Sequence, residues 1–197
     1  MFTGIVEQIG TVADVTDTEV GRHVVLTAPG IGDLAIGASI SVNGVCLTTV
    51  ETGDDTVAVD IIPETLQRSN LGSLVRESHV NLERPMPASG RFDGHIVQGH
   101  VDGLGTVEEV ARDADGGVVM TVQVPGNLVR YLVEKGSVTI DGVSLTVAAL
   151  TETGFSVALI PHTLEVTTLG LRSPGDTVNL EMDVLAKYVE RLLKVNE

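Results

Sequence analysis

The sequence begins a second time at residues 99–107, Gly99-His100-Val101-Asp102-Gly103-Leu104-Gly105-Thr106-Val107, which repeat the pattern of Gly4-Ile5-Val6-Glu7-Gln8-Ile9-Gly10-Thr11-Val12. Later segments match at a constant offset of 98 residues: Ser41–Thr48 with Thr139–Thr146, Ile62–Leu66 with Ile160–Leu164, Leu71–Gly72 with Leu169–Gly170, and Val80–Glu83 with Val178–Glu181. A repeat of this kind is one structural unit used twice. The chain of 197 residues is therefore expected to hold two homologous domains in tandem.

Both copies have the pattern of strands joined by tight turns. Short Val, Ile and Thr segments alternate with Gly, Asp and Asn, and Asn43-Gly44 and Asp141-Gly142 are hairpin-turn signals. Several short strands per copy predict a small closed barrel in each. Strands are expected at residues 23–28, 38–42, 56–61, 118–124 and 155–159, short helices at Pro63 and Pro161, and a further helix over 127–134. The opening motif is offset by 95 residues, so the second copy is expected to carry an insertion in the turn 113–117.

The composition restricts the classes of function. The net charge of −15 opposes nucleic-acid binding, and the single cysteine, Cys46, excludes an intrachain disulfide and fits a reducing compartment. No apolar run approaches the roughly 18 residues of a membrane span, and no signal peptide is evident. A cytoplasmic protein without nucleic-acid or membrane partners is expected. The acidic excess has two interpretations, solubility through self-repulsion and adaptation to high salt.

The C-terminal tail has no counterpart after the first copy. Leu185, Val189 and Leu192 recur at the spacing of an amphipathic helix, with charged residues between them. We therefore expect an N-terminal barrel over residues 1–90, a C-terminal barrel over 91–184 and a helix over 185–197. Such a short helix is marginal alone, so its apolar stripe is expected to pack on the barrels or on another copy of the chain.

Each copy presents a pair of small polar side chains on one strand. Cys46 and Thr48 alternate with apolar neighbours, and Ser144 and Thr146 do the same in the second copy. Two interpretations remain open: a half-buried strand with solvated hydroxyls, or a pair of equivalent contact surfaces for a ligand. Cys46 has no sequence-local base, so we expect it to contact a ligand rather than to act as a nucleophile.

The histidines near the second start do not form a metal site in the sequence. His95 and His100 are five residues apart, and in one strand this separation would place them on opposite faces. A structural role is favoured for His95. His100 follows Gly99, where the backbone can approach a ligand closely. No metal site is expected, because no ligand set with metal-type spacing is present, and nucleotide-loop and hydrolase signatures are also missing.

The ordered motifs together resemble the riboflavin synthase family, alpha-chain type, which is built from lumazine-binding domains. The matching segments are Met1–Glu7, Asn43–Thr48, Gly94–Val101, Asp141–Val147 and Ile160–Leu164. The resemblance spans residues 1 to about 190, and it is specific because these motifs occur in order on a twofold repeat. It implies an all-β fold of two six-stranded Greek-key barrels, and a C-terminal helix that assembles a homotrimer.

The resemblance also implies an activity. Members of the family convert two molecules of 6,7-dimethyl-8-ribityllumazine into riboflavin and 5-amino-6-(D-ribitylamino)uracil by transferring a four-carbon unit, a transferase reaction (EC 2.5.1.9) that uses no metal or cofactor. Association with lumazine synthase is a further partner interaction that the resemblance suggests. The main alternative is a non-catalytic antenna protein that binds lumazine or flavin. A flavin-reductase-type barrel would need a following nucleotide-binding domain.

The resemblance assigns residues to two lumazine sites. The first would be formed by Gly4, Ile5, Val6, Cys46, Leu47, Thr48, Asp60, Ile61, Ile62, Pro63, Glu64 and Thr65. The second would be formed by Gly99, His100, Val101, Ser144, Leu145, Thr146, Ala158, Leu159, Ile160, Pro161, His162 and Thr163, with Lys135 reaching in from a neighbouring subunit. The catalytic candidates are His100, Cys46, Ser144 and Thr146, supported by Ser41 and Asp183. His162 replaces the glutamate common in the family, which puts recognition of the ribityl chain by the second barrel in question.

Overall fold

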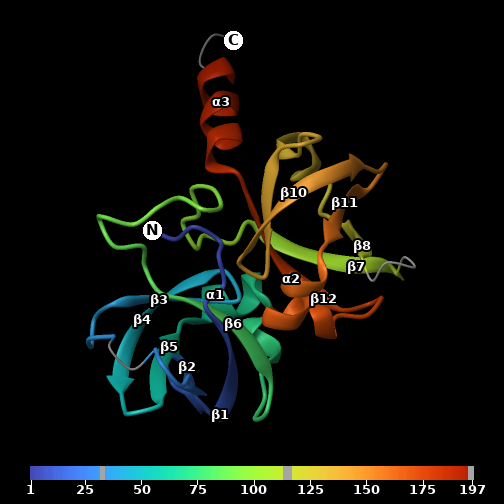
Figure 1. Ribbon diagram of the computed structural model, residues 1–197. Helices are drawn as coiled ribbons and strands as arrows, with labels where there is room; N and C mark the ends of the chain where they lie inside the picture. The colour runs from blue at the N-terminus through green and yellow to red at the C-terminus, as the bar shows by residue number, and fades with distance from the viewer. Residues whose placement is uncertain (32–33, 113–116, 195–197) are drawn as a thin grey trace.

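The computed structural model describes residues 1–31, 34–112 and 117–194. Two closed six-stranded barrels lie side by side, and one helix projects away from them at the C-terminal end (Figure 1). The strands of the first barrel fall within residues 8–83 and those of the second within residues 103–182. The predicted fold class, two tandem Greek-key barrels followed by a C-terminal helix, is confirmed.

The first barrel closes through antiparallel pairs in the order β1-β2-β5-β4-β3-β6. The last strand, β6, returns to lie between β1 and β3, which closes the sheet and leaves no free edge. β1 and β4 each contain a bulge, which increases the local bend that a small barrel needs. The bounds are β1 Gln8–Thr18, β2 Gly21–Thr27, β3 Ser39–Val42, β4 Val45–Thr52, β5 Thr56–Ile61 and β6 His79–Glu83.

The second barrel repeats this topology. Its strands follow the equivalent closed order, and bulges recur in β7 and β10, the counterparts of β1 and β4. The two copies therefore share bends as well as strand order, as expected for a duplicated unit. The bounds are β7 Gly103–Arg112, β8 Val118–Gln123, β9 Ser137–Ile140, β10 Val143–Leu150, β11 Gly154–Leu159 and β12 Thr177–Met182.

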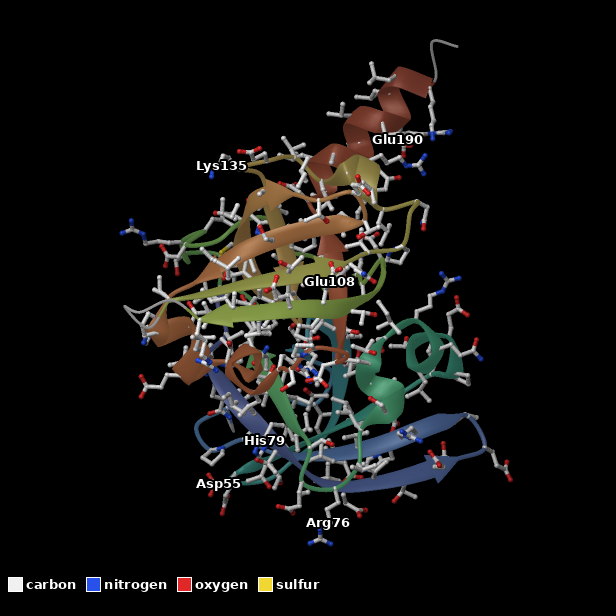
Figure 2. All side chains as sticks on the ribbon, turned by 90° about the vertical axis from the view of Figure 1, so that its right-hand side faces the viewer. Asp55, Arg76, His79, Glu108, Lys135 and Glu190 are labelled. Carbon is white, nitrogen blue, oxygen red and sulfur yellow. The ribbon has the colours of Figure 1, made fainter. Side chains whose placement is uncertain are left out.

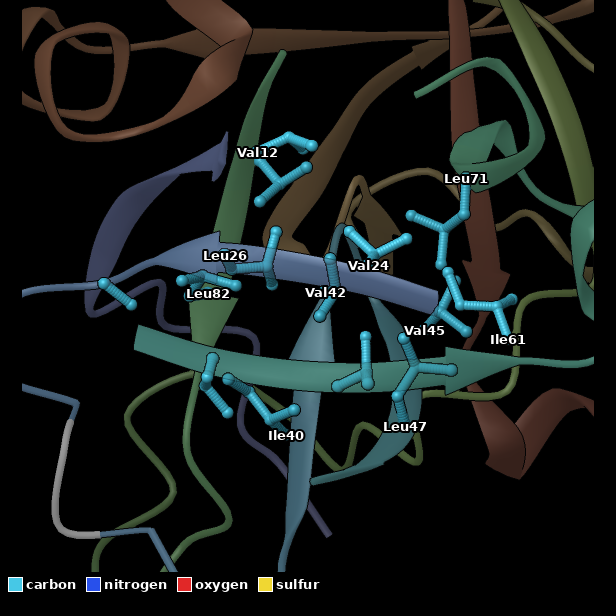
Figure 3. Packing of buried hydrophobic residues seen from close by; sticks show 14 of the residues in the cluster. Val12, Val24, Leu26, Ile40, Val42, Val45, Leu47, Ile61, Leu71 and Leu82 are labelled. Atoms are coloured by element: carbon cyan, nitrogen blue, oxygen red, sulfur yellow. The ribbon is translucent and has the colours of Figure 1, made fainter. Parts of the chain in front are cut away.

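Each barrel has its own aliphatic core. Alternate residues along the strands point inward, so the cores consist mainly of Val, Leu and Ile, as Figure 3 shows for the first barrel. In the first barrel Leu26, Ile40 and Leu82 are fully buried. Aromatic residues are scarce in the sequence, and branched aliphatic side chains fill the interior of both barrels instead. Side chains of this size suit small barrels.

The two barrels contact each other at their equivalent hairpin turns, β3–β4 and β9–β10. Asn43 and Asp141 have φ of 46° and 47°, and the glycines after them also have positive φ, as a two-residue hairpin turn of this type requires. Gly44 and Gly142 touch through their backbones. Asn81 donates to the carbonyl of Asp141 (2.9 Å), and Asn179 donates to that of Asn43 (2.8 Å). Both turns are therefore held by an asparagine of the opposite barrel.

The helices are short except for the last one. α1 (Pro63–Arg68) and α2 (Pro161–Val166) begin at proline, as predicted, and are followed by the 3₁₀ turns η1 (Asn70–Ser73) and η3 (Thr168–Leu171). The helix expected over 127–134 is wrong, because only the 3₁₀ turn η2 (Val129–Tyr131) forms there. Most of the turn predicted at 113–117 lies outside the described residues. α3 (Val184–Lys194) carries Leu185 and Val189 with more than half of their surface exposed.

Candidate functional site

The paired polar side chains lie on the outer face of each barrel. In β4, Val45 and Leu47 point into the core, whereas Cys46 is half-buried and Thr48 is exposed. In β10, Ser144 is half-buried and Thr146 is exposed. The alternation predicted from the sequence is therefore present, and each barrel offers two adjacent polar groups to whatever covers this face.

A segment of the second copy covers the polar face of the first barrel. The backbone N–H of Cys46 donates to the carbonyl of Gly99 (2.8 Å). Val101 packs against the first barrel's core. A cavity of about 200 Å³ lies where this segment meets β4 and α1. It is lined by Cys46, Glu64, Thr65, Arg68, Gly99, His100 and their neighbours. This cavity is the first candidate ligand site.

The N-terminal segment covers the polar face of the second barrel in the same way. The backbone N–H of Ser144 donates to the carbonyl of Gly4 (2.7 Å). Val6 packs against the second barrel's core. The two covering segments also pair with each other through Phe2 and Val97, which are equivalent positions of the repeat. The two candidate sites are thus related by the pseudo-twofold symmetry of the chain.

The predicted pairing of covering segments with barrels is wrong. It placed residues 4–6 with Cys46 and residues 99–101 with Ser144, whereas each segment lies on the barrel of the other copy. The physical reason is that each segment precedes the first strand of its own barrel. The segment can therefore cross to the other barrel. There its carbonyl oxygen accepts a hydrogen bond from a backbone N–H of the site strand.

The crossing requires glycine at two positions. Gly4 and Gly99 both have φ of +78°, a conformation that other residues rarely adopt. A Cβ on Gly99 would lie 2.5 Å from the Cβ of Cys46, and one on Gly4 would lie 2.6 Å from that of Ser144. Only glycine allows the covering segment to approach the site strand this closely.

His95, for which the sequence favoured a structural role, lies beside Ser144 at the second candidate site. Its Nδ1 lies 2.7 Å from the Ser144 hydroxyl, and its buried Nε2 has no hydrogen-bond partner among the described residues. Burial lowers the pKa of His95 below its usual value near 6.5, and the negative charge of Asp183 opposes this effect. His95 and His100 lie in residues 91–102, the segment that crosses to the first barrel and that lies outside the strands. The expectation that the two side chains lie on opposite faces of one strand therefore does not apply to them.

The other predicted residues divide between the two sites and their surroundings. Glu64 and Thr65 line the first cavity, and Glu64 pairs with Arg68. Asp60, Ile61 and Ile62 line a neighbouring depression, in which Asp60 contacts His23 (2.7 Å). Among their second-barrel counterparts, Ala158 and Leu159 end β11, Ile160 is the N-cap of α2, and Pro161, His162 and Thr163 begin α2. His162 has Val166 one turn further on, so the second site lacks the ion pair of the first.

Three supporting residues lie at the borders of the sites. Ser41 is buried in β3 and pairs with Cys46 on one side and Glu83 on the other. Asp183 precedes α3 and accepts a hydrogen bond from the backbone N–H of Leu185 (2.9 Å). Lys135 is exposed at the turn before β9, near the end of the second barrel from which α3 projects (Figure 2). It is therefore placed on the second barrel.

The described residues contain no helix long and apolar enough to cross a membrane. Within the same ranges, no cluster of three or more His, Cys, Asp or Glu side chains has the arrangement of a metal site.

The duplicated fold and its paired sites define a class of ligand-binding protein. A family model described as the lumazine binding domain matches residues 3–85 and again residues 98–183. The chain is 48% identical over 200 residues to the riboflavin synthase of Mycobacterium tuberculosis (strain H37Rv), with 98% of both chains covered. It is 43% identical to the riboflavin synthase of Actinobacillus pleuropneumoniae, covering 98% of this chain and 90% of the relative. The crystal structure of LumP complexed with riboflavin superposes with a TM-score of 0.84 at 25% identity, covering 92% of this chain and 99% of that one. The chain belongs to the riboflavin synthase family.

Proposed function

We propose that this protein is a riboflavin synthase, which converts two molecules of 6,7-dimethyl-8-ribityllumazine into riboflavin and 5-amino-6-(D-ribitylamino)uracil. The observation that carries the proposal is the pair of equivalent, crossed sites in one chain. A reaction between two identical molecules needs two similar pockets, and the duplication supplies them. Holding both molecules in reacting orientation supplies several kcal/mol of the barrier without any cofactor.

The two sites differ in a way that suits different roles for the two lumazines. The second site has His95 beside Ser144, and burial favours the neutral imidazole, which accepts a proton. The first site has Cys46 near Glu64 and Arg68. We assign proton removal from the C7 methyl group to the second site. The hydroxyls of Ser144 and Thr146 then stabilise the resulting anion as hydrogen-bond donors.

The remaining assignments concern substrate contacts. Gly4 to Val6 and Gly99 to Val101 contact the lumazine rings through backbone groups, and residues 60–65 and 158–163 contact the ribityl chains. His100 and Cys46 act in the first site, and Ser41 and Asp183 support the two sites from their borders. This assignment is supported by the cavity beside Cys46 and by the repetition of its parts on the second barrel.

We infer that the functional unit is a homotrimer in the cytoplasm. The exposed apolar stripe of α3 is suited to pack against other copies of the chain, and Lys135 reaches a site of a neighbouring subunit. We further propose that the two reacting lumazines come from the first site of one subunit and the second site of another. A single cysteine is consistent with a reducing compartment. Association of the trimer with lumazine synthase belongs to the same proposal.

The decisive experiment is a turnover assay. The purified protein is incubated with 6,7-dimethyl-8-ribityllumazine, and riboflavin absorbance and lumazine consumption are followed together. The expected result is one riboflavin formed for every two lumazines consumed. Binding of lumazine without riboflavin formation would favour the antenna alternative. That alternative is disfavoured by a second copy that retains Gly99-His100, Ser144-Leu145-Thr146 and Ile160-Pro161.

A further inference from the structure

Two buried glutamates occupy equivalent positions at the ends of the last strands of the barrels. Glu83 ends β6 and has 5% of its surface exposed, and Glu181 lies in β12 with 2% exposed. Buried carboxylates are costly unless their oxygens are satisfied by donors. The partners that satisfy these two carboxylates therefore indicate what they do.

Both carboxylates bind the backbone of the covering segments. Glu83 accepts from the backbone N–H of Thr3 (2.7 Å), the hydroxyl of Thr3 (2.8 Å) and the backbone N–H of Gly4 (3.0 Å). Glu181 accepts from the backbone N–H groups of Gln98 (2.8 Å), Gly99 (2.9 Å) and His100 (3.0 Å). Each carboxylate thus binds two or three successive residues through both of its oxygens.

The opposite side of each segment contacts the other barrel. Gly99, bound by Glu181 of the second barrel, accepts a hydrogen bond from Cys46 of the first barrel. Gly4, bound by Glu83 of the first barrel, accepts one from Ser144 of the second barrel. Each segment is therefore held between a carboxylate of one barrel and the site strand of the other.

We propose that Glu83 and Glu181 are crossed positioning residues: Glu181 of the second barrel sets the geometry of the first site, and Glu83 of the first barrel sets that of the second site. The proposal deepens the proposed function, because it states how the two sites of one reaction are aligned. Neither glutamate is assigned contact with substrate, so each acts through the segment that it holds.

The electrostatics of the two groups agree with this role. Burial raises the pKa of Glu83 and Glu181 above the usual value near 4.5, and the backbone N–H donors of the covering segments oppose this effect. The positive charge of Lys187 also lowers the pKa of Glu181. An amide of the same shape presents an NH₂ group to backbone N–H donors, so Glu→Gln removes acceptors without creating a cavity. Hydrogen bonds to a charged acceptor are stronger than those to a neutral one.

Cys46 provides a local test, because it is the single cysteine and lies in the first site against Gly99. The rate of its reaction with a disulfide reagent such as 5,5′-dithiobis(2-nitrobenzoate) reports how firmly the covering segment is held. In Glu181→Gln, we expect Cys46 to react about tenfold faster, because the segment loses hydrogen bonds to a charged acceptor. Protection of Cys46 by bound lumazine should be lost in the same variant. The matched control, Glu83→Gln, should leave the Cys46 rate within about twofold of the original.

A mirror experiment moves the reporter to the second site. In a Cys46→Ser, Ser144→Cys background, the roles should exchange, so that Glu83→Gln accelerates the thiol reaction and Glu181→Gln does not. If each glutamate affected the thiol on its own barrel, or both affected the two reporters equally, the crossed arrangement would be wrong. The reaction without ligand tests the proposal even if the turnover assay fails, so the two failures are distinguishable.

A measurement on the unsubstituted protein covers the case in which Glu181→Gln does not fold, as judged by circular dichroism. The amides of Gln98, Gly99 and His100 should exchange with deuterium at least about a hundredfold more slowly than unprotected amides, because they are bonded to a buried acceptor. Exchange of these amides at unprotected rates would overturn the proposal.

Discussion

At the scale of single residues, the two sites use one backbone arrangement with different side chains. A positive-φ glycine brings the covering segment against the site strand, and the side chain beside it is Cys46 in one copy and Ser144 in the other. The glycines determine the approach of the two segments, and the polar side chains determine the local chemistry. This division predicts that a substitution at the glycine disturbs one site without affecting the core of either barrel.

Gly99→Ala tests this division. The new Cβ would lie 2.5 Å from the Cβ of Cys46, so the segment must move away from the first site. We expect lumazine binding at the first site to weaken at least tenfold and the free energy of unfolding to fall by about 1–3 kcal/mol. Binding is measured by fluorescence titration and stability by denaturant unfolding.

The matched control is Gly37→Ala, which has a similar φ of +86° but has no neighbour within 4 Å. It experiences the backbone strain without the clash, so its ligand affinity should remain unchanged. Equal loss of affinity in both variants would mean that close approach at Gly99 is unimportant.

The site residues show which contacts a sequence can reveal. Alternation along one strand identified Cys46, Thr48, Ser144 and Thr146, because neighbours within a strand follow a fixed period. The crossing of the covering segments depends on contacts between residues more than 40 positions apart, about which local periodicity carries no information. The contact of His95 with Ser144 was not foreseen for a related reason: an offset of 95 places the counterpart of His95 before Met1, so the repeat offered no comparison.

The seam between the barrels contains one asymmetric ion pair. Asp141 is fully buried and pairs with Arg172 (2.6 Å), whereas the equivalent residues of the first copy are Asn43 and Leu74. Arg172→Leu alone would leave a buried carboxylate without its cation, and we expect a loss of about 3–5 kcal/mol in the free energy of unfolding.

The double variant Asp141→Asn, Arg172→Leu reproduces the pattern of the first copy and serves as the control. Its free energy of unfolding should lie within about 1 kcal/mol of the original value. Denaturant unfolding of the two variants decides the point. A double variant as unstable as Arg172→Leu would show that the second copy cannot accept the neutral pattern.

At the scale of elements, α3 is the part of the chain that the repeat does not explain. Lys187 ties it to Asp102 (2.6 Å) and Arg130 pairs with Glu190 (3.0 Å), but Leu185, Tyr188 and Val189 remain 57–64% exposed. An exposed apolar stripe on a helix that is bound to the second barrel through Lys187 and Glu190 is suited to association with equivalent helices. Figure 1 shows the helix projecting beyond the two barrels at the C-terminal end of the chain.

Leu185→Glu combined with Val189→Glu should therefore yield folded monomers with at least tenfold less activity. The reason is that two charges would have to be buried in the helix contact. Sedimentation velocity measures the oligomeric state. Val75→Glu is the control, since Val75 is also exposed (64%) but lies in the first barrel. A double variant that still sediments as a trimer would assign assembly to another surface.

The strands themselves were largely predictable, and the connections between them were not. β5 occupies the predicted residues, β3, β8 and β11 differ from the prediction by one residue at one end, and β2 begins two residues and ends one residue earlier than predicted. Their Val and Ile content and their turn signals act locally. Residues 127–134 have a composition compatible with a helix, but Pro125 and the neighbouring turns leave room only for η2. Tertiary context overrides weak propensity in such short segments.

At the scale of the whole molecule, the net charge of −15 is spread over 27 acidic and 12 basic residues. Repulsion among these charges opposes the compact state, and salt screens it. We expect the midpoint of thermal unfolding to rise steadily between about 0.05 and 2 M KCl. Differential scanning calorimetry checks this, and a midpoint that does not change with salt would remove the salt-adapted interpretation.

The central claim is that one reaction joins the first site of one chain to the second site of another. Two variants separate these halves: Cys46→Ala with Thr48→Ala damages the first site, and Ser144→Ala with Thr146→Ala damages the second. His100 is left intact, because its segment belongs to the first site although it lies in the second copy. Each variant alone should be nearly inactive, since every reaction centre contains one damaged half.

The most direct measurement is the rate of riboflavin formation after the two variants are unfolded and refolded together. Random assortment into symmetric trimers should place two intact halves together in about one quarter of the centres, so about a quarter of the original activity should return. Mass spectrometry confirms that hybrid trimers have formed. Absence of any recovered activity in such hybrids would contradict the account, because the two sites would then have to react within a single chain.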